Sequence, residues 1–203
     1  MKRRLGFFDV DCRELTDAGD GLQFRPRVKP LAPRLEQIYG LARRLEAPLV
    51  FTTCCSGRML DAGSLNDVLL VPLDAADQQW RRRLDSAALI CLAKKTYNDP
   101  PKNYACRAFD MFADNANAVA MVRALDVGEW VVFGNGFDLC VNAAVRGLLA
   151  AGQNVRVVTD VTIASAKGYG RCGTDEYRRE ILADFAAAGV RLCTLDDLLA
   201  EMS

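Results

Sequence analysis

Short apolar runs alternate with segments of helical periodicity along this chain. The runs that predict buried strands cover residues 5–10, 47–53, 87–93, 129–135, 154–161 and 190–195. Between them, apolar residues recur at helical spacing in residues 32–46, 113–124, 138–151, 175–188 and 195–202. Residues 54–80 show neither period and are expected to be irregular. Buried strands that alternate with helices predict a Rossmann-like α/β fold, a parallel sheet with helices on both faces.

Length and composition fit one globular domain over residues 1–203. The chain is 51% hydrophobic and 26% charged, which is typical of globular proteins, and it shows no internal repeat or linker. No apolar run approaches the ~20 residues that a membrane-spanning helix needs. The basic N-terminus is followed by an apolar stretch that Asp9 interrupts, which is too short for a signal peptide. We therefore expect a cytoplasmic protein with no membrane partner.

Charge gives no reason to expect a polyanionic partner. The chain has 26 basic and 26 acidic residues, so its formal net charge is zero. No overall field attracts nucleic acid or an anionic membrane. The one basic run, residues 81–83, is interpreted as a solvated helix face. Neither nucleic acid nor an anionic membrane is therefore expected as a partner.

The cysteine and histidine counts restrict the chemistry. The eight cysteines include no C-x-x-C pair, and without a secretory signal they indicate a reducing compartment rather than a disulfide framework. The chain has no histidine, which excludes Ser-His-Asp and Cys-His mechanisms and the commonest zinc ligand. Any catalytic base must therefore be a carboxylate or a lysine.

Polar and reactive side chains follow three of the predicted strands. Asp9 and Asp11 end the first, Lys94 and Lys95 end the third, and the loop "GNGFDLC" leads from the fourth to Cys140. Ligands of parallel α/β sheets bind beyond the carboxyl ends of the strands. These groups are therefore expected to converge on one site.

The stretch "FFDVD", residues 7–11, resembles the opening of haloacid-dehalogenase-type phosphatases, in which the first aspartate attacks phosphate. That family continues with a Gly-Thr or similar hydroxyl, whereas Cys12-Arg13 stands here. It also needs a downstream acidic pair for magnesium. The pair Asp196-Asp197 opens the last predicted helix, where it is better explained as a cap. The phosphatase interpretation is therefore disfavoured.

Cys140 lies in a position that favours a reactive thiolate. The two glycines of "GNG" allow a tight turn that exposes backbone N–H groups. Cys140 then begins an amphipathic helix, where the positive end of the helix dipole stabilises a thiolate. The other seven cysteines are interpreted as small buried hydrophobic residues.

The stretch 130–161 resembles the isochorismatase-like cysteine hydrolases, which include nicotinamidases and N-carbamoyl amidases. That family shows an apolar strand, the motif Gly-x-x-x-Asp-x-Cys-Val, a helix of small residues, a glycine and a strand that ends in aspartate. This pattern matches the following residues: Gly134, Asp138, Cys140-Val141, Ala143-Ala144, Gly152 and Asp160. The resemblance extends over nearly the whole chain through "FFDVDCRELTDAGDGLQF", "APLVFTT", "LICLAKKTY" and "FDMFADNAN".

This resemblance implies an Asp-Lys-Cys catalytic triad. Cys140 would attack a carbonyl or imine-like carbon, the aspartate would move the thiol proton to the leaving group, and the lysine would keep both groups ionised. The family's motifs favour Asp11, with Asp9 as the alternative. The family's Lys-x-Thr-Tyr spacing favours Lys94 over Lys95, and the adjacent residue of a strand points to the opposite face.

The resemblance also implies an oxyanion hole made of the backbone N–H groups of Gly136 and Cys140. The peptide bond between Asn135 and Gly136 would be cis, at a cost of about 3 kcal/mol.

Two departures from the family narrow the expected activity. Nicotinamidases bind a metal through an Asp-x-His…His set, where this chain has "TTCCSGRML" at residues 52–60. Cys54 and Cys55 are adjacent and have no evident partner pair, so neither a metal nor another cofactor is expected. The glutamine after the family's first strand is also replaced, with Arg13 nearby.

The expected protein is a metal-free hydrolase of small amide, imide or carbamoyl C–N bonds. The alternative is a catalytically silent relative that binds a small ligand or a partner protein. A homo-oligomer is expected because the family commonly forms dimers or tetramers.

Overall fold

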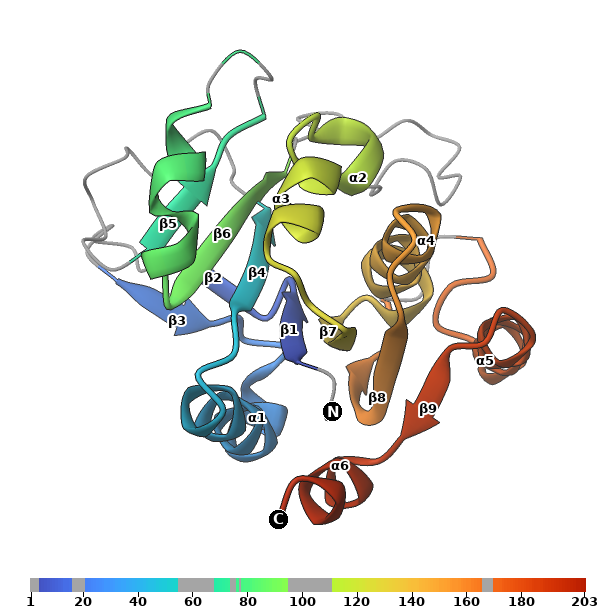
Figure 1. Cartoon of the computed structure of the whole chain (residues 1–203). Helices are drawn as coiled ribbons and strands as arrows, with labels where there is room; N and C mark the ends of the chain where they lie inside the picture. The colour runs from blue at the N-terminus through green and yellow to red at the C-terminus, as the bar shows by residue number, and fades with distance from the viewer. Residues whose placement is uncertain are drawn as a thin grey trace.

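A computed structural model describes residues 4–15, 21–54, 68–73, 76, 78–94, 111–165 and 170–203. A seven-stranded sheet lies at the centre, with helices on both faces (Figure 1). In spatial order its strands are β5 (Val68–Val71), β6 (Leu89–Lys94), β4 (Leu49–Cys54), β1 (Leu5–Val10), β7 (Glu129–Asn135), β8 (Val155–Ile163) and β9 (Arg191–Cys193). Every neighbouring pair is parallel, as the alternation of strands and helices predicted.

Two apolar cores fill the layers on either side of the sheet. The core that we name the α1 core packs α1 (Ala32–Arg44) and α6 (Leu195–Glu201) against one face. The α4 core packs α3 (Ala118–Ala124), α4 (Asn142–Ala150) and α5 (Asp175–Ala187) against the other, with the short α2 (Met111–Asp114). Successive strand residues supply opposite cores: in β1, Phe7 enters the α1 core and Phe8 the α4 core.

The direction in which the chain is wound reverses at the centre of the sheet. From β1 the chain passes over α1 to β4 on one side, and from β7 it passes over α4 to β8 on the other. Because parallel crossovers are right-handed, these opposite directions put α1 and α4 on opposite faces. Ligands of such sheets bind where the direction reverses, which here is the carboxyl ends of β1 and β7.

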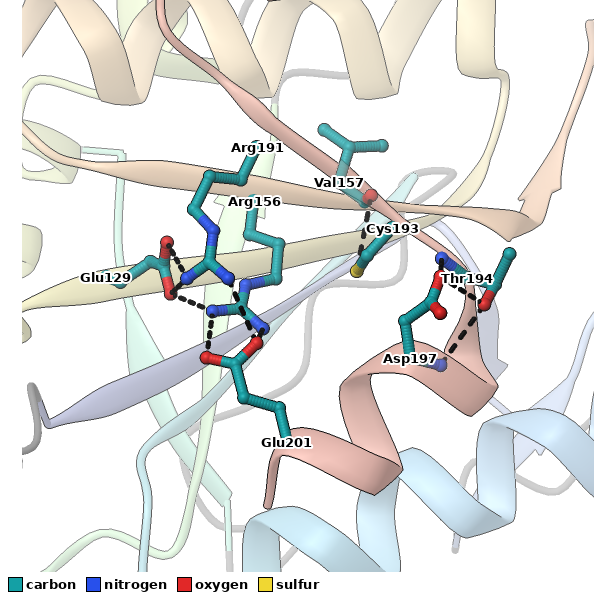
Figure 2. Close-up of polar contacts among 8 residues, drawn as sticks. All are labelled: Glu129, Arg156, Val157, Arg191, Cys193, Thr194, Asp197 and Glu201. Atoms are coloured by element: carbon teal, nitrogen blue, oxygen red, sulfur yellow. Dashed lines mark hydrogen bonds and ion pairs between the residues drawn. The ribbon is translucent and has the colours of Figure 1, made fainter.

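Four charged side chains join the amino-terminal ends of β7, β8 and β9 to α6 (Figure 2). The buried Arg156 donates through Nη2 to Glu129 Oε2 at 2.7 Å and through Nη1 to Glu201 Oε2 at 2.7 Å. Arg191 reaches the same two carboxylates at 3.3 Å and 3.0 Å. This network fixes the start of each strand to the C-terminal helix.

Helix ends and the basic run agree with the sequence interpretation. Asp197 forms a capping box with Thr194, accepting from its backbone N–H at 2.9 Å while its own N–H donates to Thr194 Oγ1 at 3.1 Å (Figure 2). Arg81–Arg83 are exposed, on the 3-10 helix Gln79–Ser86. No helix in the described part of the chain is long and apolar enough to cross a membrane.

Several elements were not predicted. β5 lies within residues 54–80, which were expected to be irregular, and the 3-10 helix Gln79–Ser86 begins at the end of that segment. An antiparallel hairpin of β2 (Arg13–Leu15) and β3 (Leu22–Phe24) follows β1, and a short 3-10 helix spans Lys29–Leu31. The helix expected over 113–124 is divided into α2 and α3, and the helix expected over 138–151 begins as a π-helix, Phe137–Val141.

Candidate active site

The predicted site positions lie along the carboxyl edge of four neighbouring strands. In the sheet register Val10 of β1 pairs with Thr52 of β4 and with Gly134 of β7. Lys94 is the last residue of β6 and pairs with Cys54 of β4. Asp11 therefore follows the central strand, with the lysine on one side and the cysteine loop on the other.

Asp9 is a buried carboxyl group on the α1 side of the sheet. It is inaccessible to solvent, and Tyr39 of α1 donates its hydroxyl to Asp9 Oδ2 at 2.7 Å. The Cys12 N–H donates to Oδ1 at 3.3 Å, and Arg13 Nε lies 3.5 Å from Oδ2. Burial raises the Asp9 pKa above its ordinary value, against the lowering effects of Arg13, Cys12 and Tyr39.

Asp11 lies just beyond β1 with its backbone in the left-handed region, at φ 54°. Its carboxylate is buried and accepts a hydrogen bond from Thr52 Oγ1 at 3.0 Å. Thr52 is two residues after Val50, a member of the α4 core, so strand alternation directs its hydroxyl to that side. The positive φ thus turns the Asp11 carboxylate toward the α4 side, whereas Asp9 faces α1.

Cys140 lies on the same side as Asp11. It belongs to the α4 core, is 7% exposed, and follows the turn formed by Gly134 and Gly136. Gly134 has φ 130°, and a Cβ there would be 2.2 Å from the Val10 carbonyl oxygen. Only glycine allows this approach, which packs the cysteine loop against the end of β1.

Asp138 fastens this loop to the segments that follow β8. The buried carboxylate accepts from the Ser165 N–H at 2.7 Å and from the Gly173 N–H. Burial raises its pKa, but the hydrogen bonds from Ser165 and Gly173 outweigh that effect and the pKa lies below its ordinary value. The sequence motif included Asp138 without a role, because its partners lie 27 and 35 residues away.

No family model matches the sequence, and no curated protein matches it either. Solved structures do resemble it over nearly its whole length. An isochorismatase-like hydrolase from Alkaliphilus metalliredigens is 16% identical with a TM-score of 0.59, covering 98% of this chain and 99% of its own. N-carbamoylsarcosine amidase from Thermoplasma acidophilum is 16% identical with a TM-score of 0.55, covering 95% and 97%. YcaC from Escherichia coli, an octameric hydrolase of unknown specificity, is 18% identical with a TM-score of 0.52, covering 96% and 78%.

The chain has the isochorismatase-like hydrolase fold. The resemblance stated from sequence motifs therefore holds at the level of architecture, with Cys140 after β7 and Asp11 after β1.

Of the two lysine candidates, only the backbone of Lys94 is described within this isochorismatase-like fold. The backbone of Lys94 ends β6, but its side chain is not described, and Lys95 lies outside the described residues. The structure therefore gives the place of the Lys94 backbone at the end of β6, but not the position of its ammonium group.

The expected cis peptide is absent from the described backbone, and the Gly136 N–H of the expected oxyanion hole already has a partner. The Gly136 N–H donates to the Ile163 carbonyl at 3.0 Å, so it is occupied and does not face a substrate oxygen. The bond between Asn135 and Gly136 is trans, since the described backbone contains no cis peptide, and that expectation was wrong. Positive φ angles at Gly134 and Gly136 make the turn instead, which avoids the cost of a cis non-proline bond.

The residues of this isochorismatase-like fold do not match a histidine metal site. The sequence contains no histidine. Within the described ranges, no three Cys, Asp or Glu side chains gather as a metal-binding group. Of the pair considered earlier, Cys54 is described only as part of β4, and Cys55 lies outside the described residues. No metal is therefore assigned a role in the reaction.

Proposed function

We propose that this chain is a cysteine hydrolase that cleaves a small amide, imide or carbamoyl C–N bond through a thioester on Cys140. The observation that carries the proposal is the turn at Asp11. Its positive φ and its hydrogen bond with Thr52 bring a buried carboxylate to the same side of the sheet as Cys140. A carboxylate and a thiol that follow adjacent strands on the same side of the sheet are the base and nucleophile that a cysteine hydrolase without histidine requires.

In the proposed reaction Asp11 removes the thiol proton as Cys140 Sγ attacks the substrate carbon. The C–N bond then breaks, and the nitrogen leaves with the proton that Asp11 returns to it. Water attacks the thioester, restores the thiol and releases the acid. Lys94 is proposed to favour the ionised states of Asp11 and Cys140.

Asp11 is preferred to Asp9 as the base for a geometric reason. The Asp9 carboxylate accepts hydrogen bonds from Tyr39 and Cys12 within the α1 layer, on the opposite side from Cys140. Asp9 remains the alternative base, and Lys95 the alternative lysine.

The amidase among the similar structures supports a small C–N substrate, and the octameric YcaC supports a homo-oligomer. The proposed protein therefore forms a homo-oligomer in a reducing cytosol and needs no cofactor. Light scattering on the purified protein tests the assembly, and a species of 22.3 kDa would contradict it.

A catalytically silent ligand-binding protein is the second candidate. It is favoured by the Gly136 N–H, which is occupied by Ile163, and by the limited exposure of Cys140. Such a protein would bind its ligand at the carboxyl edge of the sheet but would not form a thioester.

Alkylation and turnover separate the two candidates. Iodoacetamide should label Cys140 preferentially in a pH-dependent way, as read by peptide mass spectrometry. A screen of nicotinamide, N-carbamoyl amino acids and small imides should release ammonia, and Cys140→Ser should abolish that release while Cys193→Ser retains it. An inert Cys140 together with a negative screen would support the silent protein.

A further inference from the structure

A buried serine hydroxyl lies beside the cysteine loop. Ser165, two residues after the end of β8, is 7% exposed. Its Oγ atom is inaccessible to solvent and has no hydrogen bond in good geometry with a described residue, although the Asp138 carboxylate lies close enough for the hydroxyl to lower its pKa. Burying a hydroxyl without a partner costs free energy, so such a group calls for an explanation.

Ser165 Oγ and Cys140 border the same space. A Cβ built on Gly136 would lie 3.4 Å from Ser165 Oγ, 3.6 Å from the Cys140 nitrogen and 3.7 Å from Cys140 Cβ. Since Gly136 has no side chain, no side-chain atom of that residue separates the serine hydroxyl from the backbone nitrogen and Cβ of Cys140.

The backbone holds Ser165 in this place. Its N–H donates to Asp138 Oδ1 at 2.7 Å, and the preceding Ala164 carbonyl accepts from Arg27 Nη2 at 2.7 Å. The hydroxyl also lies near enough to the Asp138 carboxylate to help lower its pKa. Asp138 thus couples the position of Ser165 to the loop that carries Cys140.

We propose that the Ser165 hydroxyl donates a hydrogen bond to the oxyanion that forms when Cys140 attacks a carbonyl substrate. This inference rests on the proposed function and assigns Ser165 the task that the Gly136 N–H cannot perform while it donates to Ile163. As the Sγ–C bond forms, the C=O π electrons move to oxygen, and the hydroxyl stabilises that charge without transferring its proton. The ligand class is a planar carbonyl compound.

Benzaldehyde is a probe that requires no known substrate. A thiol adds to an aldehyde to give a hemithioacetal, whose tetrahedral oxygen occupies the position of the oxyanion. Binding is measured as protection of Cys140 from iodoacetamide over a benzaldehyde titration. The hemithioacetal oxygen is a neutral hydroxyl, so Ser165→Ala should weaken this protection about 2- to 12-fold, the effect of losing a hydrogen bond between neutral groups.

Three comparisons make the result specific. Alkylation by iodoacetamide alone forms no oxyanion, so its rate should be unchanged in Ser165→Ala. Ser165→Thr, which keeps the hydroxyl, should restore most of the protection. Ser86→Ala removes a hydroxyl that donates to Arg83 before the start of β6, at the opposite edge of the sheet, and should match the wild type.

Two results would overturn the inference alone. Unchanged benzaldehyde protection in Ser165→Ala would show that the hydroxyl does not contact the oxyanion. Equal losses of protection and of iodoacetamide reactivity would show that Ser165 only positions the loop. If Cys140 is inert in the wild type, the proposed function fails, and this inference fails with it.

Discussion

Thr52 and Asp11 exchange hydrogen bonds in both directions at the ends of neighbouring strands. Thr52 Oγ1 donates to Asp11 Oδ1 at 3.0 Å and accepts from the Asp11 N–H at 3.1 Å. The Asp11 N–H also lies 3.2 Å from the Thr52 carbonyl oxygen. One side chain therefore fixes both the backbone turn and the carboxylate of the proposed base.

Thr52→Val should lower turnover about tenfold or more, because the Asp11 carboxylate loses the Thr52 hydroxyl that orients it. The unfolding free energy should fall by about 0.5–1.5 kcal/mol, the typical contribution of one hydrogen bond. Thr52→Ser should recover most of both. Turnover and urea unfolding check the pair of effects, and unchanged kcat in Thr52→Val would contradict the positioning role.

Asp11→Asn and Lys94→Met should each reduce kcat by about 10²- to 10⁴-fold, as expected for loss of a general base or its partner. Because both act on the Cys140 proton, the double variant should be scarcely slower than either single one. Full additivity of the two effects on kcat would show that they act independently.

Asp9→Asn is the matched control, since it neutralises a carboxyl group two residues from Asp11 on the α1 side. It should affect stability more than kcat. If Asp9→Asn is as inactive as Cys140→Ser while Asp11→Asn retains turnover, Asp9 is the triad aspartate.

Asp138→Asn should change how stability depends on pH. The folded-state pKa of Asp138 is lowered, so its contribution is present above the ordinary aspartate pKa and is lost as pH falls through the folded pKa. The wild type should therefore lose stability below about pH 4 more steeply than Asp138→Asn. Urea midpoints between neutral pH and pH 2.5 test this, and parallel curves would contradict it.

Arg156→Met should destabilise the fold by about 3–5 kcal/mol, because it removes one partner of a buried ion pair and leaves Glu129 less compensated. Arg156 and Glu129 are 1% and 3% exposed, and Figure 2 shows the contact between their side chains. Arg146→Ala is the control, since its pair with Asp184 is exposed and should contribute about 0–1 kcal/mol. Equal losses in urea unfolding would show that burial does not strengthen the network.

Exhaustive chelation should leave turnover unchanged, because the sequence offers no histidine and no C-x-x-C pair as metal ligands. Metal analysis before and after treatment provides the measurement. Stoichiometric zinc in the purified protein, together with lost turnover on chelation, would assign a metal to residues 54–60.

The sequence alone determined the order of most strands and helices and the chemistry available at their ends. Apolar runs such as residues 5–10 and 129–135 coincide with β1 and β7, because strands buried on both faces need continuous apolar side chains. The glycine turn before Cys140 was equally visible, since glycine adopts the positive φ angles of Gly134 and Gly136 more readily than any other residue. β5 was missed because four residues carry too little periodicity to predict a strand without the neighbour that pairs with it.

Only the tertiary structure decided which face each aspartate presents and which backbone donors are occupied. Asp9 and Asp11 differ by two positions, so strand alternation would place both on one face. The positive φ at Asp11 and the hydroxyl of Thr52, 41 residues away, send Asp11 to the other. In the same way, the Ile163 carbonyl takes the N–H of Gly136, and Asp138 brings Ser165 to the cysteine loop. These contacts join segments far apart in the chain, and only packing of the sheet brings them within hydrogen-bonding distance.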